Sequence, residues 1–230
     1  MKRAIAILMM VAGSLAAFGA TAQTSQADLA ALRQKALAGD PAAQVKVGMS
    51  YALAWPRDSK EAIRWLRMAA DQGYPDGEYR LAGMLDVGIS PQNPTEAVKW
   101  YTLAAKQGYR DAQYRLGVMY DQGRGVTQSY TEAANWYRRA ADQGRAEAQY
   151  RLGLMYEEGQ GVPKDYRQAL NWYMKAAAQN RPEAEYKVGY FYEKGYGVTP
   201  SRDQAIAWYQ RADQHGDGLA HDALKALSEQ

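Results

Sequence analysis

The chain contains no cysteine among its 230 residues. Disulfide bonds are therefore excluded, and the fold has to be stabilised by packing alone. Without a cysteine after the apolar N-terminal run, attachment to a membrane through a lipidated cysteine is excluded as well. Catalysis by a thiol nucleophile is ruled out for the same reason.

Histidine is almost as scarce, with only His215 and His221 in the chain. They lie six residues apart around an expected helix break, and no further ligand accompanies them, so no metal site is predicted. The sequence also lacks the Ser-x-x-Lys, Gly-x-Ser-x-Gly and His-Glu-x-x-His motifs of common hydrolases. Acidic residues recur at equivalent positions, which is typical of solvated faces and not of one catalytic pair. We expect neither a cofactor nor an enzymatic activity.

A strong net charge is missing too. The formal net charge of +3 falls to +1 without Lys2 and Arg3, because residues 1–22 contain no acid. A nearly neutral chain has no broad field for nucleic acid, so nucleic acid is not a predicted partner. Beyond residue 22 no stretch is apolar enough to cross a membrane, and stable membrane insertion is not expected.

Residues 1–22 have the organisation of a signal peptide. Lys2 and Arg3 form a basic start, an apolar run covers Ala4–Ala17, and Ala20-Thr21-Ala22 provides small residues at a cleavage site. An uncleaved anchor is the alternative, but the run is shorter than a usual bilayer span. The segment predicts an exported, soluble, periplasmic protein that is not a lipoprotein, and secretion beyond the cell is the alternative.

Tryptophan recurs at an almost constant spacing and sets the register of an internal repeat. The spacings are 35, 36, 36 and 36 residues between Trp65, Trp100, Trp136, Trp172 and Trp208. Five copies follow from this register, over residues 39–72, 73–107, 108–143, 144–179 and 180–215. Residues 23–38 are expected to form a linker and a capping helix, and residues 216–230 a second capping helix.

Each copy is predicted to be a pair of helices. In the fourth copy, apolar residues recur at helical spacing around Leu152 and again around Trp172, and Gly159 and Gly161 lie between the two stripes. Neither helix could bury its stripe alone, so the copies have to stack into an all-α solenoid of helix-turn-helix repeats. Gly153 interrupts the first helix, which indicates that a Trp or Tyr of another helix packs against its backbone.

The same pattern resembles a known family. The third copy carries it as Ala112, Leu116, Gly117, Tyr120, Gly123, Gly125 and Val126, followed by Ala133, Trp136, Tyr137, Ala140 and Ala141. This arrangement is similar to the Sel-one-like repeat, a relative of the tetratricopeptide repeat, and the resemblance covers residues 39–215. It implies a right-handed α/α superhelix that serves as a protein-interaction scaffold, often in an exported bacterial protein.

The resemblance also implies where a partner would bind. In tetratricopeptide geometry the first helix of each repeat lines the concave side, and helical spacing then selects one stripe of residues. The stripe contains four equivalent tyrosines, the acids that follow them, and two residues between: Tyr79, Tyr114, Tyr150 and Tyr186; Asp121, Glu157 and Glu193; Leu154 and Tyr190. Such a groove suits a protein or peptide segment carrying Lys or Arg. The alternative is that the tyrosines cover seams between helices and the acids only confer solubility.

We therefore expect an exported, non-enzymatic scaffold that binds a protein or peptide along this groove. A second interpretation is peptidoglycan binding, in which the tyrosines stack on cell-wall sugars. A third, a hydrolase acting on cell wall or β-lactam, rests on family analogy alone.

Overall fold

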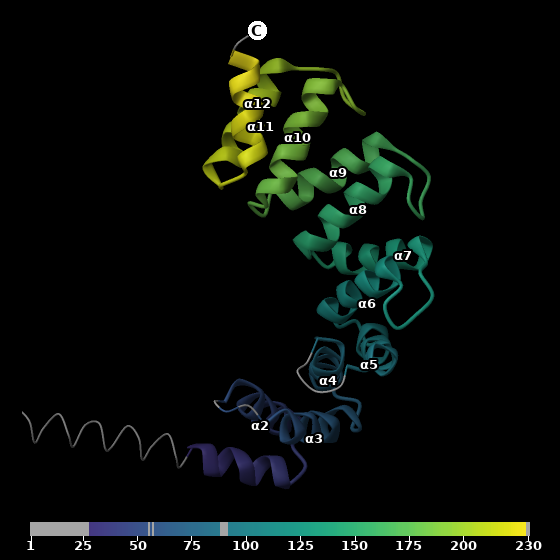
Figure 1. Cartoon of the computed structure of the whole chain (residues 1–230), viewed down its shortest axis with the longest axis vertical. Helices are drawn as coiled ribbons and strands as arrows, with labels where there is room; N and C mark the ends of the chain where they lie inside the picture. The colour runs from purple at the N-terminus through teal and green to yellow at the C-terminus, as the bar shows by residue number, and fades with distance from the viewer. Residues whose placement is uncertain (1–27, 55, 57, 88–91, 229–230) are drawn as a thin grey trace, which may run out of the picture.

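The computed structural model describes residues 28–54, 56, 58–87 and 92–228 (Figure 1). The expected signal peptide lies outside these ranges. Within them every regular element is a helix, beginning with one over residues 28–37. The others, in chain order, are α2 (Pro41–Leu53), α3 (Ser59–Ala70), α4 (Pro75–Val87), α5 (Pro94–Lys106), α6 (Arg110–Gln122), α7 (Tyr130–Asp142), α8 (Ala146–Glu158), α9 (Tyr166–Ala177), α10 (Pro182–Lys194), α11 (Arg202–Gln214) and α12 (Gly218–Ser228).

The helices are stacked in series, and each packs against the next in the chain. Even-numbered helices from α2 to α10 are the first of each repeat, and the odd-numbered helices that follow are the second. The stack curves into a crescent, in which α4 and α6 lie nearer the open side than α5 and α7 (Figure 1). The predicted all-α solenoid of helix pairs is confirmed. None of the helices in the described ranges has the length and apolar character needed to span a membrane.

In the third, fourth and fifth repeats the two helices begin differently, whereas in the first repeat Asp40 caps α2 as Asp58 caps α3. Each second helix starts after a residue whose side-chain oxygen accepts a backbone N–H of the first turn, which satisfies an otherwise unpaired donor. These caps are Asp58, Asn93, Ser129, Asp165 and Ser201. The first helices α6, α8 and α10 follow Tyr109, Arg145 and Arg181, which make no side-chain cap bond. Side chains at this second set of positions are therefore available for contacts between repeats.

The turn within the third, fourth and fifth repeats contains two glycines, which are needed for different reasons, as the fourth repeat shows. Gly159 ends α8 with a φ of 77°, in the left-handed region that glycine adopts without strain. At Gly161 a Cβ atom would lie 2.2 Å from the carbonyl carbon of Tyr130, at the start of α7. The second glycine thus permits backbone contact with the preceding repeat. Val162 follows and packs against the core.

The glycine inside the first helix of the third, fourth and fifth repeats allows a tyrosine to pack on bare backbone, whereas Gly48 in the first repeat meets Leu66. A Cβ at Gly153 would lie 2.6 Å from ring atoms of Tyr173, a residue with no exposed surface. Gly117 meets Tyr137, and Gly189 meets Tyr209, in the same way. The predicted aromatic approach is confirmed, and the residue that makes it is tyrosine, not tryptophan.

A buried pair of amides links neighbouring repeats. Gln149 on α8 donates to the carbonyl oxygen of Ala141 at 3.1 Å and accepts from Gln179 at 2.8 Å. It thereby joins the end of one repeat to both helices of the next. We call this arrangement the amide clasp. It recurs with Gln113 and Gln143, and with Gln44 and Gln72.

In the fifth repeat the amide clasp is replaced by charged groups. Glu185 occupies the place of Gln149, and its side chain has no exposed surface. One carboxylate oxygen pairs with Arg211 Nε at 2.5 Å, and the other lies 2.7 Å from Nδ1 of His215, which ends α11. In the second repeat Glu78 holds the same place and accepts from Gln107 at 2.9 Å.

Candidate functional site

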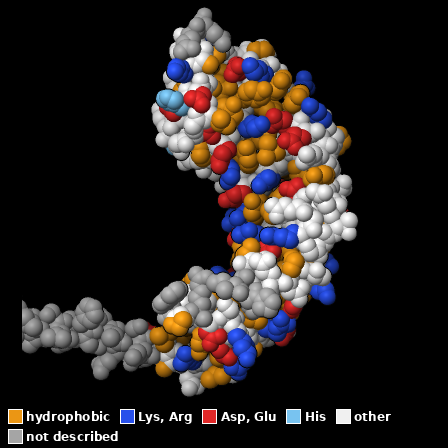
Figure 2. All heavy atoms as spheres, viewed as in Figure 1, with side chains coloured by type: hydrophobic (Ala, Val, Ile, Leu, Met, Phe, Trp, Pro, Cys, Tyr) orange, Lys and Arg blue, Asp and Glu red, His pale blue; other side chains and the backbone are white. Residues whose placement is uncertain are grey.

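The predicted site residues lie on four consecutive first helices. Tyr79 is on α4; Tyr114 and Asp121 are on α6; Tyr150, Leu154 and Glu157 are on α8; Tyr186, Tyr190 and Glu193 are on α10. We call Tyr79, Tyr114, Tyr150 and Tyr186 the tyrosine ladder. All four are half-buried. The crescent is hollowed on one side, and charged side chains of both signs line its inner margin (Figure 2).

Each tyrosine of the ladder packs on a buried tyrosine of the second helix in its repeat. The ring centroids lie 5.5 to 5.9 Å apart in the pairs Tyr79–Tyr101, Tyr114–Tyr137, Tyr150–Tyr173 and Tyr186–Tyr209. These separations are typical of favourable aromatic pairs. The ladder therefore covers the seams between helices, which is one of the two roles that the sequence left open, and each ring keeps part of its surface exposed.

The acids of the predicted groove hold the hydroxyl groups of the buried tyrosines. Tyr137 donates to Asp121 at 3.2 Å, and Tyr209 donates to Glu193 at 2.7 Å. Tyr173 donates to Glu157 in the same manner. Burial of the phenol, together with the neighbouring carboxylate, raises the pKa of each of these tyrosines. These acids are thus structural acceptors as well as a source of negative charge.

Two of the acids also bind a lysine. Both carboxylate oxygens of Glu157 lie 3.0 Å from Lys187 Nζ on the next first helix. Glu193 lies 2.5 Å from Lys194. Burial opposes ionisation of Glu193, but the hydrogen bonds from Lys194 and Tyr209 outweigh it and lower the pKa of this carboxyl group. Part of the negative charge predicted for the groove is therefore already neutralised by Lys187 and Lys194.

A set of residues missed by the sequence reasoning covers the tyrosine ladder. The residue just before each of α6, α8 and α10 reaches back to the preceding tyrosine of the ladder. The Arg145 guanidinium carbon lies 4.4 Å from the ring centroid of Tyr114, and that of Arg181 lies 5.2 Å from the ring centroid of Tyr150. Tyr109 takes this place on Tyr79, with centroids 5.0 Å apart. We call Tyr109, Arg145, Arg181 and Asp217 the cover positions; they are 36 residues apart. This constant spacing was the signal in the sequence.

Leu154 and Tyr190 are at equivalent positions, one turn beyond the ladder. Leu154 packs against the buried core of the fourth and fifth repeats. Tyr190 lies 6.4 Å from Tyr186 and 5.8 Å from Tyr196, between ring centroids. Tyr196 in turn stacks on Tyr166 at 4.6 Å. The C-terminal end of the stripe is therefore the most aromatic.

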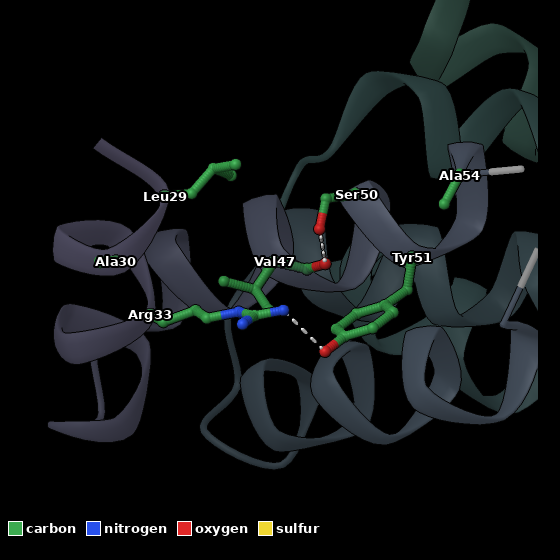
Figure 3. Close-up of a pocket in the computed structure, with 7 residues that line it drawn as sticks. All are labelled: Leu29, Ala30, Arg33, Val47, Ser50, Tyr51 and Ala54. Carbon is green, nitrogen blue, oxygen red and sulfur yellow. Dashed lines mark hydrogen bonds between the residues drawn. The ribbon is translucent and has the colours of Figure 1, made fainter. Parts of the chain in front are cut away.

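A separate cavity of about 390 Å³ lies between the helix at residues 28–37 and α2 (Figure 3). Its lining is mainly apolar, and a hydrogen bond of 3.0 Å from Arg33 to the hydroxyl group of Tyr51 crosses it. It contains none of the predicted site residues. The described residues contain no group of three His, Asp or Glu side chains able to hold a metal ion.

Comparison with known proteins identifies the repeat. The Sel1 repeat matches residues 41–74, 75–109, 110–144, 146–180 and 182–217. No curated protein matches the chain. A protective antigen of uropathogenic Escherichia coli with an SLR fold is 39% identical and superposes with a TM-score of 0.82, over 85% of this chain and 43% of that one. A Sel1 repeat protein of Oxalobacter formigenes is 37% identical, with a TM-score of 0.75, over 86% and 58%.

The chain thus spans about half the length of these two relatives. A Sel1 repeat protein of Klebsiella pneumoniae, 22% identical, shares the fold with a TM-score of 0.53 over 87% of this chain and 99% of that one. The repeat matches cover nearly all of residues 41–217, and both nearer relatives pass 30% identity over most of this chain. The chain belongs to the Sel1 repeat family.

Proposed function

We propose that the protein is an exported, non-catalytic scaffold that binds a protein or peptide segment along the concave side of the solenoid. The observation that carries this proposal is the tyrosine ladder: four half-exposed rings at equivalent places on consecutive first helices, each fixed from behind by a buried tyrosine. Rigid aromatic side chains lose little conformational entropy on binding, which makes them effective contact residues. Repeats that stack in one dimension present such residues as an extended surface.

Export to the periplasm is the second part of the proposal, and it rests on residues 1–22. The lack of cysteine is compatible with it, since the amide clasps and the tyrosine packing stabilise the stack without disulfides. Cleavage before Gln23 would be detected by N-terminal sequencing of the protein recovered from a periplasmic fraction. Retention of residues 1–22 in the mature protein would contradict it.

Peptidoglycan binding is supported less well. A sugar stacks on the open face of an aromatic ring, whereas guanidinium groups already cover Tyr114 and Tyr150. Sedimentation with purified peptidoglycan distinguishes the two interpretations. Hydrolysis of cell wall or β-lactam has no site to support it among the described residues, and turnover that persists after loss of Asp121, Glu157 and Glu193 would point to a site elsewhere.

The main experiment is photocrosslinking from single positions in cells. A photoreactive phenylalanine analogue replaces Tyr150 or Tyr186, and in matched controls it replaces Leu103 on α5 or Met174 on α9, which are 45% and 41% exposed. We expect the same crosslinked partner from both ladder positions and none from the controls. Crosslinks of equal yield from Met174 and Tyr186 would contradict binding along the concave side.

A further inference from the structure

The cover positions belong to a row of alternating charges that runs between repeats. Arg145 pairs with Asp111 of the preceding repeat, and its Nε lies 3.4 Å from Glu147 of its own. Arg181 continues the row, with Nη1 3.9 Å from Glu147 and Nε 3.4 Å from Glu183. Each arginine thus lies between two acids and over one ring of the tyrosine ladder. The chain itself demonstrates, twice, that a guanidinium group fits this environment.

The row ends differently at the fifth repeat. Glu183 and Tyr186 are equivalent to Glu147 and Tyr150, but the cover position holds Asp217 in place of arginine. Leu219 stands at the position equivalent to Glu183, the second acid beside Arg181, so Asp217 takes the role of the second acid here. Asp217 caps α12 by accepting the N–H of Ala220 at 3.0 Å. Glu183 pairs with Arg181 on one side, and its side chain is 50% exposed. In the described part of the chain, no cation lies over the Tyr186 ring and none pairs with Asp217.

The two lysines of α10 are engaged elsewhere. Lys194 pairs with Glu193, and Lys187 pairs with Glu157. Burial and the charges of Asp217 and Glu193 raise the pKa of Tyr186, while Lys194 opposes this shift. The surroundings of Tyr186 are therefore net negative, because among the described residues Asp217 and Glu193 are opposed there only by Lys194.

We propose that an arginine side chain of an extended partner segment occupies the place on Tyr186, between Glu183 and Asp217, that Arg145 and Arg181 occupy on the preceding rings. This inference rests on the proposed function and names the chemistry of its partner at one position. A guanidinium group suits the place because it stacks on a ring and donates to carboxylates in the same plane. The partner segment would enter at the end of the ladder where the ring is uncovered.

The test uses the full chain with ¹³C-labelled tyrosine and the peptide acetyl-Gly-Ser-Arg-Ser-Gly-amide as the probe. Tyr186→Phe identifies the Tyr186 signal and retains an aromatic face. We expect saturable shifts of the Tyr186 resonance, and binding about tenfold weaker for the same peptide with citrulline, which keeps the shape but lacks the charge. Equal binding of both peptides would overturn the proposal.

Asp217→Arg supplies the missing guanidinium from the chain itself. It reproduces the residue found before α8 and α10, so the fold has a precedent for it. We expect this variant to lose the peptide response at Tyr186, whereas Asp217→Asn, which keeps a capping oxygen, weakens it by about three- to tenfold. An unchanged response in Asp217→Arg would also overturn the proposal. If the crosslinks at Tyr150 persist in that case, the scaffold function stands and only the arginine position fails.

Discussion

The fourth and fifth repeats share their helices, turns and buried tyrosines, yet they differ at the two places where repeats meet. At the buried seam, the amides of Gln149 and Gln179 are replaced by Glu185, which forms an ion pair with Arg211 and contacts the imidazole of His215. At the tyrosine ladder, the cover position changes from Arg181 to Asp217. The residues of the repeat pattern therefore determine the fold, whereas residues outside the pattern determine which charged groups lie at the contacts between repeats.

The largest effect should come from the charged seam. Arg211→Ala leaves Glu185 buried with only His215 beside it, so we expect the free energy of unfolding to fall by about 2–4 kcal/mol, as for a broken buried pair with one partly exposed member. The equivalent change in the fourth repeat, Lys175→Ala, removes a cation 3.9 Å from the ring of Trp172 and should cost under about 1 kcal/mol.

Urea unfolding followed by circular dichroism measures both variants. Glu185→Gln in the Arg211→Ala background should recover most of the loss, because a neutral amide no longer needs the cation. Equal losses in Arg211→Ala and Lys175→Ala would show that the two seams are energetically alike and would end the comparison.

The next largest effect should come from the glycine inside the first helix, a feature that the fourth and fifth repeats share. Gly153→Ala and Gly189→Ala each force a methyl group to within 2.6–2.7 Å of a tyrosine ring, and each should lower stability by about 1–3 kcal/mol. Gly83→Ala is the matched control on α4, because its Cβ would meet only the hydroxyl oxygen of Tyr101, at 3.6 Å. It should raise stability by up to about 1 kcal/mol through helix propensity. A loss of Tm in Gly83→Ala equal to that in Gly153→Ala would contradict the packing argument.

A smaller effect, on the pH dependence of Tm, should come from the second repeat, where the carboxyl group of Glu78 takes the place of the Gln149 amide. Burial raises the pKa of Glu78, and the hydrogen bond from Gln107 only partly offsets it. A carboxyl group whose pKa is raised by folding destabilises the protein above that pKa, and the penalty disappears as pH falls through it towards the unfolded value. Glu78→Gln should therefore raise Tm at pH 7 and leave it unchanged in acid.

Gln113→Glu is the reciprocal change in the third repeat, where the amide clasp is neutral. It should lower Tm at pH 7 and have less effect in acid. The same Tm difference at both pH values, in either variant, would mean that the carboxyl group at this place is not perturbed by folding.

The smallest effect should come from removing the arginine at the cover position of the fourth repeat, which then resembles the fifth in having no cation of the described residues over its ladder tyrosine. Arg181→Ala removes the cation from Tyr150 and should cost under about 1 kcal/mol, because the arginine is partly exposed. The variant should gain a response to the arginine peptide at the Tyr150 resonance. A variant that remains silent at Tyr150 would show that two flanking acids and a ring are not sufficient for a guanidinium group.

The sequence was sufficient for the fold because the repeat carries redundant information. Five tryptophans, recurring glycines and apolar stripes all indicate the same pairs of helices, and the structure confirms the solenoid. The helical glycine even predicted an aromatic contact, although helical periodicity does not state which aromatic residue makes it. Gly153 meets Tyr173, one position after Trp172.

The candidate site was only partly accessible from the sequence. Helical spacing selected the tyrosine ladder within each first helix, but its cover comes from the following repeat, 31 residues later for Tyr114 and Arg145. That contact depends on how repeats stack, which no pattern within one helix contains. The hydrogen bond of Asp121 with Tyr137 depends instead on how the two helices of one repeat pack, which the spacing within a single helix does not contain either. The role of the ladder in binding stays a prediction.

The backbone contact at Gly161 has a mechanical consequence. Because this glycine lies directly against the start of α7, any side chain there would act as a wedge and open the angle between adjacent repeats. The bend of the arc, and with it the span between its two tips, is therefore adjustable by one substitution in a turn. Evolution or design could retune the reach of the molecule in this way without altering any residue of the ladder.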